Sequence, residues 1–279
     1  PIELGPVTVP GFYYLPFLGE NRALEYELTF RRAIQLPASW TGARSAGFHP
    51  LVEFESADYF CEAEIEDPQG DARPLGTHQG YIGRFGLETG PLESGILVVR
   101  TRDIRQSTEG VEVEEVARTT VQGIDPTGWG VNVAGLIEPV HLRLTGALYL
   151  RNAYAATLVP GDPAEVRFGI EIVPWIDGPF QAELDFEIQA DGTTVASGSF
   201  DASATDEVPR RPVAVFHHAD LAGLPTWRPG EPALEVQMKL VHQGTITDAR
   251  TVHLYNRRLT VEGNRFQLDD HTVFLRGGG

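Results

Sequence analysis

The chain has 279 residues, about twice the length of a typical domain, so the length predicts two domains, each large enough to bury its own core. The formal net charge of −17 at pH 7 argues against nucleic acid or an anionic membrane surface as partners, because the summed field repels phosphate groups. The single cysteine, Cys61, excludes an intramolecular disulfide and a thiolate metal cluster, and we expect it to be a small buried core side chain.

No stretch reaches the roughly 18 to 20 apolar residues that a membrane-spanning helix needs, and residues 1–17 lack the charged start and apolar core of a signal peptide. We therefore expect no membrane partner. Both a cytoplasmic location and export with an earlier signal removed stay open. Lys239 is the only lysine, and together with the many Ala, Gly and Pro residues this composition is typical of a GC-rich bacterial genome.

Alternation of apolar and polar residues dominates the chain and predicts β-strands. The runs, in chain order, are 23–36, 51–56, 59–66, 95–102, 140–146, 164–173, 180–190, 212–218 and 233–243. Clusters of Gly, Pro, Asn and Asp separate them, and no segment of a dozen residues has a helical period. Acidic residues at alternate positions of a run, such as Glu183, Asp185 and Glu187, indicate a solvated sheet face. The sequence therefore predicts an all-β protein of antiparallel sheets, packed as two sandwiches in series.

Residues 120–139, rich in Gly and Pro and poorly patterned, precede a strand and then a fresh series of runs near Ala147. We accordingly predict a first domain over 1–146 and a second over 147–257. Residues 258–279 form a third segment, in which Gly263-Asn264 and Asp269-Asp270 are turn signals between short apolar runs, and this pattern predicts a C-terminal β-hairpin.

That last segment resembles the junction of glycoside hydrolase family two, the group of β-galactosidases, β-glucuronidases and β-mannosidases. The family's F-x-L-N-G-x-x-hydrophobic-hydrophobic-L-R-G is similar to "FQLDDHTVFLRGGG" here, with Phe266, Leu268, Leu275 and Arg276 in register. The Asn-Gly of the family is replaced by Asp269-Asp270.

Upstream stretches resemble the family in the same order. "LPTWRPGEPALEVQMKL" (224–240) is similar to W-S-P-x-x-P-x-L-Y, with Glu235 in place of the tyrosine, and "GTHQGYIGRFGLETG" (76–90) is similar to G-x-H-x-G-G-Y-x-x-F. "LPASW" and "LVEFESADYFCEAEI" resemble P-x-x-W and L-x-F-x-G-V-D, and "WGVNVAGLIEPVHLRL" (129–144) resembles W-x-x-x-G-I-x-R-x-V-x-L.

The resemblance implies a galactose-binding-like jelly-roll sandwich, then an immunoglobulin-like sandwich, then a catalytic (β/α)-barrel that would begin where this chain stops. Both catalytic carboxylates of the family belong to the barrel, so the resemblance implies no catalytic residue in the chain, which alone would be inactive. We expect no metal and no cofactor. The expected role is the non-catalytic, sugar-binding and scaffolding portion of a glycosidase that acts on β-glycosides, with carbohydrate and the missing barrel as partners.

Sugar binding needs an aromatic ring for the apolar face of a pyranose and polar groups for its hydroxyls. The candidates with this chemistry in predicted loops are Trp40, His78, Gln79, Tyr81 and Trp129. The family also has an acidic residue two positions before the tryptophan matched by Trp129. Thr127 stands there in this chain, and Asp125, four positions before, is the remaining acidic candidate. The competing interpretation is that these side chains brace the first domain or plug a domain interface.

Other polar clusters have simpler explanations. His217 and His218 are adjacent in a predicted strand, so their side chains should point to opposite faces and cannot share a metal. Two further hypotheses for the whole chain stay open: a free-standing carbohydrate-binding or adhesion protein without hydrolase activity, and a purely structural pair of sandwiches in a larger assembly. Neither the sugar nor the oligomeric state follows from the sequence.

Overall fold

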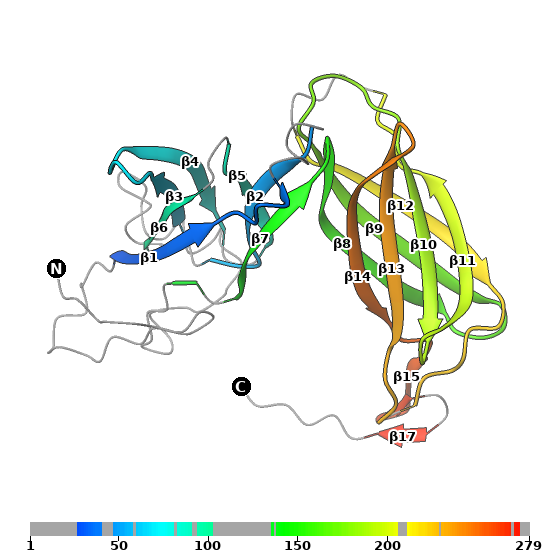
Figure 1. Ribbon diagram of the computed structural model, residues 1–279. Helices are drawn as coiled ribbons and strands as arrows, with labels where there is room; N and C mark the ends of the chain where they lie inside the picture. Colours follow the sequence, from blue (N-terminus) through cyan, green and yellow to red (C-terminus); the bar gives the residue numbers. More distant parts are fainter. Residues whose placement is uncertain are drawn as a thin grey trace, which may run out of the picture. The chain divides into compact units, whose positions relative to one another are not determined.

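In a computed structural model, the described residues are 27–40, 47–57, 60–80, 83–90, 94–102, 135–136, 138–205, 211–228, 230–268 and 271–273. The named secondary-structure elements in these ranges, β1 to β17, are β-strands in antiparallel sheets, as the period-two pattern predicts. The chain divides into two compact units, residues 1–144 and 145–279 (Figure 1).

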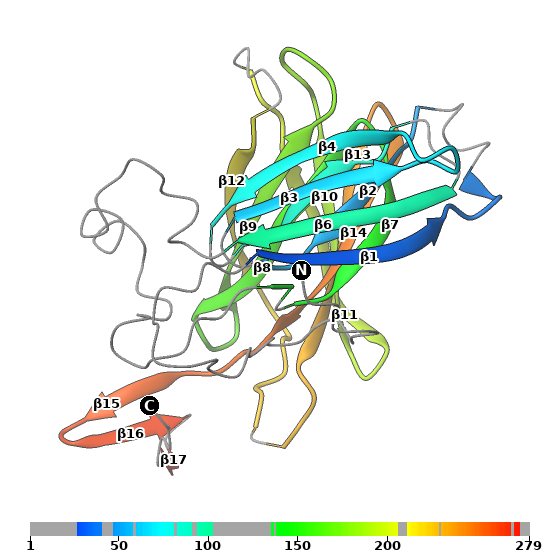
Figure 2. The same cartoon turned by 90° about the vertical axis from the view of Figure 1, so that its left-hand side faces the viewer.

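The first unit is a sandwich of two sheets. Its strands are β1 (Glu27–Gln35), β2 (His49–Phe54), β3 (Phe60–Glu66), β4 (Ala72–Gln79), β5 (Phe85–Glu88), β6 (Ser94–Arg102) and β7 (Val140–Thr145). One sheet has the order β1-β6-β3-β4, which Figure 2 shows, and the other has the order β5-β2-β7. Alternate side chains of both sheets meet in one core that includes Phe54, Cys61, Ile65, Phe85 and Val99.

The second unit contains a sandwich of seven strands. They are β8 (Leu148–Val159), β9 (Ala164–Pro174), β10 (Glu183–Ala190), β11 (Thr193–Asp201), β12 (Val213–Leu221), β13 (Leu234–His242) and β14 (Thr245–Leu254). The sheet β12-β9-β8 faces the sheet β11-β10-β13-β14 (Figure 1). This order differs from that of constant-type immunoglobulin domains only in the fourth strand, β11, which lies beside β10 instead of β12.

The core of the second unit lies between these two sheets and is built from the apolar members of each alternating run. Phe168 on β9 packs against Phe186 on β10, with ring centroids 4.4 Å apart. Leu184, Met238 and Leu240 are fully buried around them. The outward-facing members of the same strands are polar, so each run buries one face and exposes the other.

Side chains of β14 fasten β8, which belongs to the opposite sheet. Leu150 lies at a register shift of β8, where its backbone groups leave the ladder with β9. Its N–H donates to Asp248 Oδ2 at 2.7 Å, and its carbonyl accepts from Arg250 Nε at 3.1 Å and Nη2 at 2.9 Å. We call this group the Leu150 clamp. It satisfies a buried backbone position and joins the two sheets along one side of the sandwich.

The last described strands form an antiparallel meander of β15 (Leu259–Glu262), β16 (Arg265–Leu268) and β17 (His271–Val273). Gly263 has a φ of 62°, which suits the two-residue turn between β15 and β16 (Figure 2). The predicted C-terminal hairpin is therefore confirmed. Asp269 and Asp270, the second predicted turn, lie outside the described residues.

Candidate functional site

His78 lies on β4 opposite Cys61 and turns its ring toward the interior of the first sandwich. The ring stacks on Phe85 at a centroid distance of 3.9 Å, and Phe85 stacks on the fully buried Phe54 at 4.7 Å. A Cβ on Gly80 would lie 3.2 Å from His78 Nε2, so the chain passes close over the imidazole edge. These contacts make His78 a brace between the two sheets of the unit.

Gln79 and Trp40 lie apart from that stack. Gln79 pairs with Phe60 on β3 and is exposed on the opposite face of β4, because consecutive strand residues alternate. Trp40 is half-buried in the turn after β1, where its N–H donates to Pro37 O at 2.9 Å. The structure does not bring His78 and Gln79 to one face. Tyr81, Asp125 and Trp129 lie outside the described residues, so a shared sugar site in the first unit stays a prediction.

The outer face of the four-stranded sheet of the first unit carries rows of ion pairs. Acidic side chains of β3 alternate outward and meet arginines of the neighbouring strands, in the pairs Glu62 with Arg102, Glu64 with Arg100 and Glu66 with Arg31. The hydrogen bond from Arg31 lowers the pKa of the Glu66 carboxyl. In these three pairs each carboxylate has an arginine partner.

One carboxylate of the first unit is deeply buried. Glu53 on β2 is 1% exposed and accepts a hydrogen bond from Arg143 Nη1 on β7 at 3.0 Å. Glu55, the residue that follows β2, lies 3.3 Å from Arg84 and 3.2 Å from His141. These pairs tie β2 to its neighbours across the outer face of the three-stranded sheet, and each acidic group has a cationic or imidazole partner at hand.

The described residues bear on thiol chemistry and on metal binding. Burial raises the pKa of the Cys61 thiol to about 12, so the thiolate needed for nucleophilic or redox chemistry does not form near neutral pH, and the prediction of a buried core cysteine is confirmed. No cluster of three or more His, Cys, Asp or Glu in these ranges is placed to hold a metal ion. The same ranges contain no helix long and apolar enough to span a bilayer.

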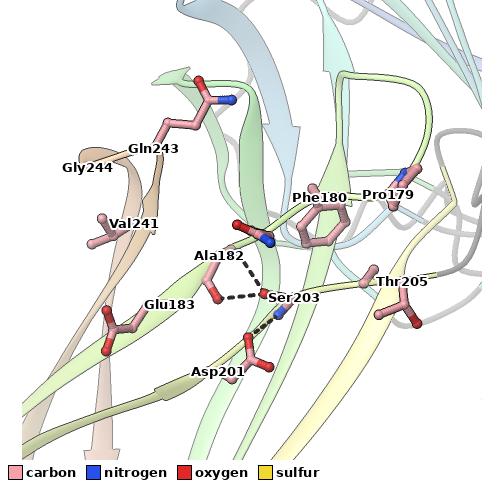
Figure 3. A pocket seen from close by; sticks show the side chains of 12 residues that line it. Pro179, Phe180, Ala182, Glu183, Asp201, Ser203, Thr205, Val241, Gln243 and Gly244 are labelled. Carbon is pink, nitrogen blue, oxygen red and sulfur yellow. Dashed lines mark hydrogen bonds between the residues drawn. The ribbon is translucent and has the colours of Figure 1, made fainter.

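A depression lies at one end of the second unit, between β10, β11 and the β13–β14 turn (Figure 3). It has a volume of about 870 Å³, and polar side chains line much of it: Gln181, Glu183, Asp201, Ser203, Thr205 and Gln243. Ser203 donates its hydroxyl to Ala182 O at 3.3 Å and accepts from Ala182 N at 3.0 Å. Such a surface can hydrogen-bond a polar ligand but has no exposed aromatic ring to stack on a sugar.

The two carboxylates of this depression are both acceptors. Glu183 and Asp201 lie directly opposite each other on β10 and β11, and Ser199 donates to Glu183. Hydrogen bonds from the Ser203 side chain and backbone lower the pKa of Asp201, which therefore stays ionised at neutral pH. Sequence reasoning assigned Glu183 to a solvated sheet face and missed the depression. The turn residues Pro179, Gln243 and Gly244 lie at its rim, but only the fold brings them together.

His217 and His218 on β12 confirm the predicted alternation. His217 faces inward and stacks on Phe200 at 4.5 Å, whereas His218 faces outward and lies 3.2 Å from Glu165 on β9. The two imidazoles therefore belong to different environments, as expected from a period of two residues.

Comparison with known proteins identifies the fold. No protein-family profile and no curated protein match the sequence. A β-glucuronidase from Bacteroides uniformis matches with a TM-score of 0.65 and 17% identity over 97% of this chain and 31% of that chain. A glycosyl hydrolase family 2 member from Bacteroides cellulosilyticus gives 0.60 and 17% over 90% and 31%. A family 2 β-galacturonidase from Eisenbergiella tayi, bound to galacturonate, gives 0.58 and 13% over 94% and 44%.

The likeness covers nearly the whole of this chain, so the succession of two β-sandwiches is an arrangement that it shares with part of each of these glycosidases. The chain spans less than half the length of each. At 13–17% identity the comparison establishes the fold, and the chain is a glycosidase-like pair of sandwiches in this structural sense.

Proposed function

We propose that this chain is the non-catalytic, sugar-binding and scaffolding portion of a glycoside hydrolase that acts on β-glycosides. The observation that carries the proposal is the match to a β-glucuronidase over 97% of this chain but only 31% of that chain. The likeness runs through both sandwich units in order, and motifs from Trp40 to Arg276 resemble family two in the same order.

The described carboxyl groups whose pKa is shifted are stabilised in the ionised form, unlike the proton donor of a glycosidase. A glycosidase needs a carboxylic acid with a raised pKa as its proton donor, next to an ionised partner. Every described carboxyl group with a shifted pKa has it lowered by hydrogen bonds: Glu66, Glu171, Glu187 and Asp201. We infer that both catalytic carboxylates come from a barrel that would follow Gly279, and that residues 1–279 alone do not hydrolyse glycosides.

The proposal also assigns a role to each part of the chain. A jelly-roll domain over 1–146 would shape one wall of the sugar pocket with Trp40, His78, Gln79, Tyr81, Asp125 and Trp129. An immunoglobulin-like domain over 147–257 would be the spacer, and 258–279 would lead into the barrel. The inward stacking of His78 supports bracing for this residue, so we expect its substitution to act on stability before sugar affinity.

The test is hydrolysis of aryl β-galactoside, β-glucuronide and β-mannoside, with the 279-residue chain and with the native gene product assayed side by side. We expect turnover of at least one substrate by the native product and none by the chain. Turnover by the chain that survives purification, at a constant activity per milligram, would overturn the proposal.

A free-standing carbohydrate-binding protein is the second candidate, and one observation favours it. Tyr154 and Phe216 are 41% and 55% exposed on the second unit, where aromatic surface of this kind can serve sugar binding without a barrel. This alternative predicts a native product of the same length as the chain and saccharide affinity without hydrolysis.

A further inference from the structure

An aromatic row crosses the outer face of the sheet β12-β9-β8 in the second unit. Phe216 on β12 and Tyr154 on β8 both lie in register with Gly169 on the central strand β9. Residues in one row of a sheet share a face, and core residues such as Phe168 point to the other. The two aromatic side chains are therefore presented to solvent on either side of a glycine, and we call these three residues the aromatic row.

Because Gly169 has no side chain, the ring of Tyr154 can pack against the sheet. A Cβ on Gly169 would come within 2.2 Å of Tyr154 Cε1, 2.4 Å of Cζ and 2.7 Å of the hydroxyl oxygen. The distal part of the ring therefore occupies the space above the glycine. A glycine inside a central strand costs stability, and close approach of another group is the usual reason for one. Covering such a glycine by an aromatic ring recovers part of that loss.

Phe216 has no comparable packing reason to be where it is. Phe216 is 55% exposed, whereas the inward-facing residues of the same strand, such as Val213 and Val215, pack against the core. The guanidinium of Arg167 lies over the ring, 4.5 Å from its centroid, and Arg167 Nε is buried without a hydrogen-bond partner. The cation–π contact holds the ring in place on the surface.

Hydrogen-bonding groups flank the aromatic row on both sides, one strand period away. On one side, Glu171 accepts from Arg151 Nε at 2.8 Å and from Asn152 Nδ2 at 2.6 Å. On the other side, His218 lies 3.2 Å from Glu165. Asn152, Glu171 and His218 are each two residues along a strand from a member of the aromatic row. Residues two apart on a strand are about 7 Å apart, so these three side chains lie within reach of a ligand that rests on the rings. Acidic and basic groups are mixed, without a block of one sign.

We propose that the aromatic row is a binding surface for a neutral glycan chain, whose pyranose faces stack on Tyr154 and Phe216. The flanking Glu171, Asn152 and Arg167 would hydrogen-bond the sugar hydroxyls, which is the chemistry that sugars require of a binding surface. A neutral glycan fits because the net charge of −17 repels polyanions. The surface is separate from the candidate residues of the first unit, and the inference stands whether or not the chain is part of a hydrolase.

The test is affinity electrophoresis of the full 279-residue chain through gels that contain neutral β-linked glucan, mannan, galactan or xylan, with polygalacturonate as the charged comparison. We expect retardation by at least one neutral polysaccharide and none by polygalacturonate. Phe216→Ala and Tyr154→Ala should each weaken binding roughly three- to tenfold, because that is the range of a lost aromatic contact. Phe216→Trp should retain binding.

The matched control is Ile246→Ala, which removes an apolar side chain of similar exposure, 51%, from β14 on the other sheet. It should bind like the parent chain, and circular dichroism should show all variants folded. No retardation by any neutral glycan, or equal retardation of the parent and Phe216→Ala, would overturn the proposal. Concentration-dependent dimers that Phe216→Ala abolishes would also overturn it and assign the face to a second copy. This test measures glycan binding and not hydrolysis, so failure of the glycan-binding proposal is distinguishable from failure of the proposed function.

Discussion

The Leu150 clamp gives a sharp test of how the second sandwich is held closed. Asp248 is 6% exposed, and its Oδ2 accepts the N–H of the fully buried Leu150. Asp248→Ala removes this acceptor and leaves a backbone donor inside the protein. Asp248→Asn keeps an oxygen in the same position. We therefore expect a large loss of stability from the alanine variant and a smaller one from the asparagine variant.

The size of the effect follows from the burial of the orphaned N–H. A buried donor without an acceptor costs about 1–3 kcal/mol, and we take about 2 kcal/mol for Asp248→Ala. The second unit, residues 145–279, has an unfolding entropy of about 0.28 kcal/mol/K at roughly 2.1 cal/mol/K per residue. The expected fall in Tm is therefore about 7 °C. For Asp248→Asn we expect less than half of this.

Differential scanning calorimetry of the parent chain and the variants measures this directly, because separate transitions of the two units can be resolved. Asp185→Ala is the matched control: it removes an exposed aspartate from β10 of the same unit and should change Tm by less than about 2 °C. If Asp248→Ala melts within 2 °C of Asp185→Ala, the clamp does not stabilise the sandwich and the reasoning is refuted.

Three further predictions concern single side chains. Cys61 should resist a thiol reagent at pH 8 in the folded chain and react rapidly in urea, because burial raises its pKa to about 12. Burial alone would raise the pKa of Glu171, but the hydrogen bonds it accepts, among them those from Arg151, lower it overall. Glu171 thus adds stability above its unfolded pKa, and the advantage of the parent over Glu171→Gln should disappear as pH falls through the lowered folded value. His78→Ala should destabilise the first unit by about 1–3 kcal/mol, because it removes the stack on Phe85 and its buried area.

For each of these three predictions, one result would contradict it. Rapid labelling of Cys61 in the native state, at a rate independent of urea, would contradict its burial. A Glu171→Gln difference that grows on acidification would reverse the sign of the pKa shift. An unchanged melting temperature for His78→Ala, combined with lost saccharide binding, would turn His78 from a brace into a sugar contact.

The strands that could be predicted from the sequence are those with uninterrupted alternation. The runs at 59–66, 95–102 and 164–173 become β3, β6 and β9 with ends that agree within one residue. In each, every second side chain enters a core, so the pattern is a direct record of burial.

The strands that were missed have broken patterns for physical reasons. β8 contains two register shifts, so its apolar positions change face partway along. β11 is rich in small and polar residues, and Gly198 lies under the ring of Phe186, which supplies the packing that the strand itself lacks. β4 carries Pro74 beside a register shift. Pairing with neighbouring strands stabilises these three strands, and the residue pattern of one strand alone does not show that pairing.

The candidate site, like the strands, could be predicted from the sequence only in part. Residue chemistry selects His78 and Gln79 as sugar contacts, but the register of β4 against β3 sends them to opposite faces. The aromatic row depends on three strands in register, and the sequence separates Tyr154 from Phe216 by 61 intervening residues. A strand-like run with a central glycine, "VRFGIEI" (166–172), is its local signal in the sequence.

The central claim, that this chain is the non-catalytic part of a glycosidase, is tested most directly by the intact mass of the native gene product, captured with an antibody against the 279-residue chain. The account predicts a mass well above 30.6 kDa. If the proportions match those of the β-glucuronidase, the mass is about 96 kDa, because 97% of this 30.6 kDa chain corresponds to 31% of that protein. A native product of about 30.6 kDa would contradict the account and leave a free-standing binding protein in its place.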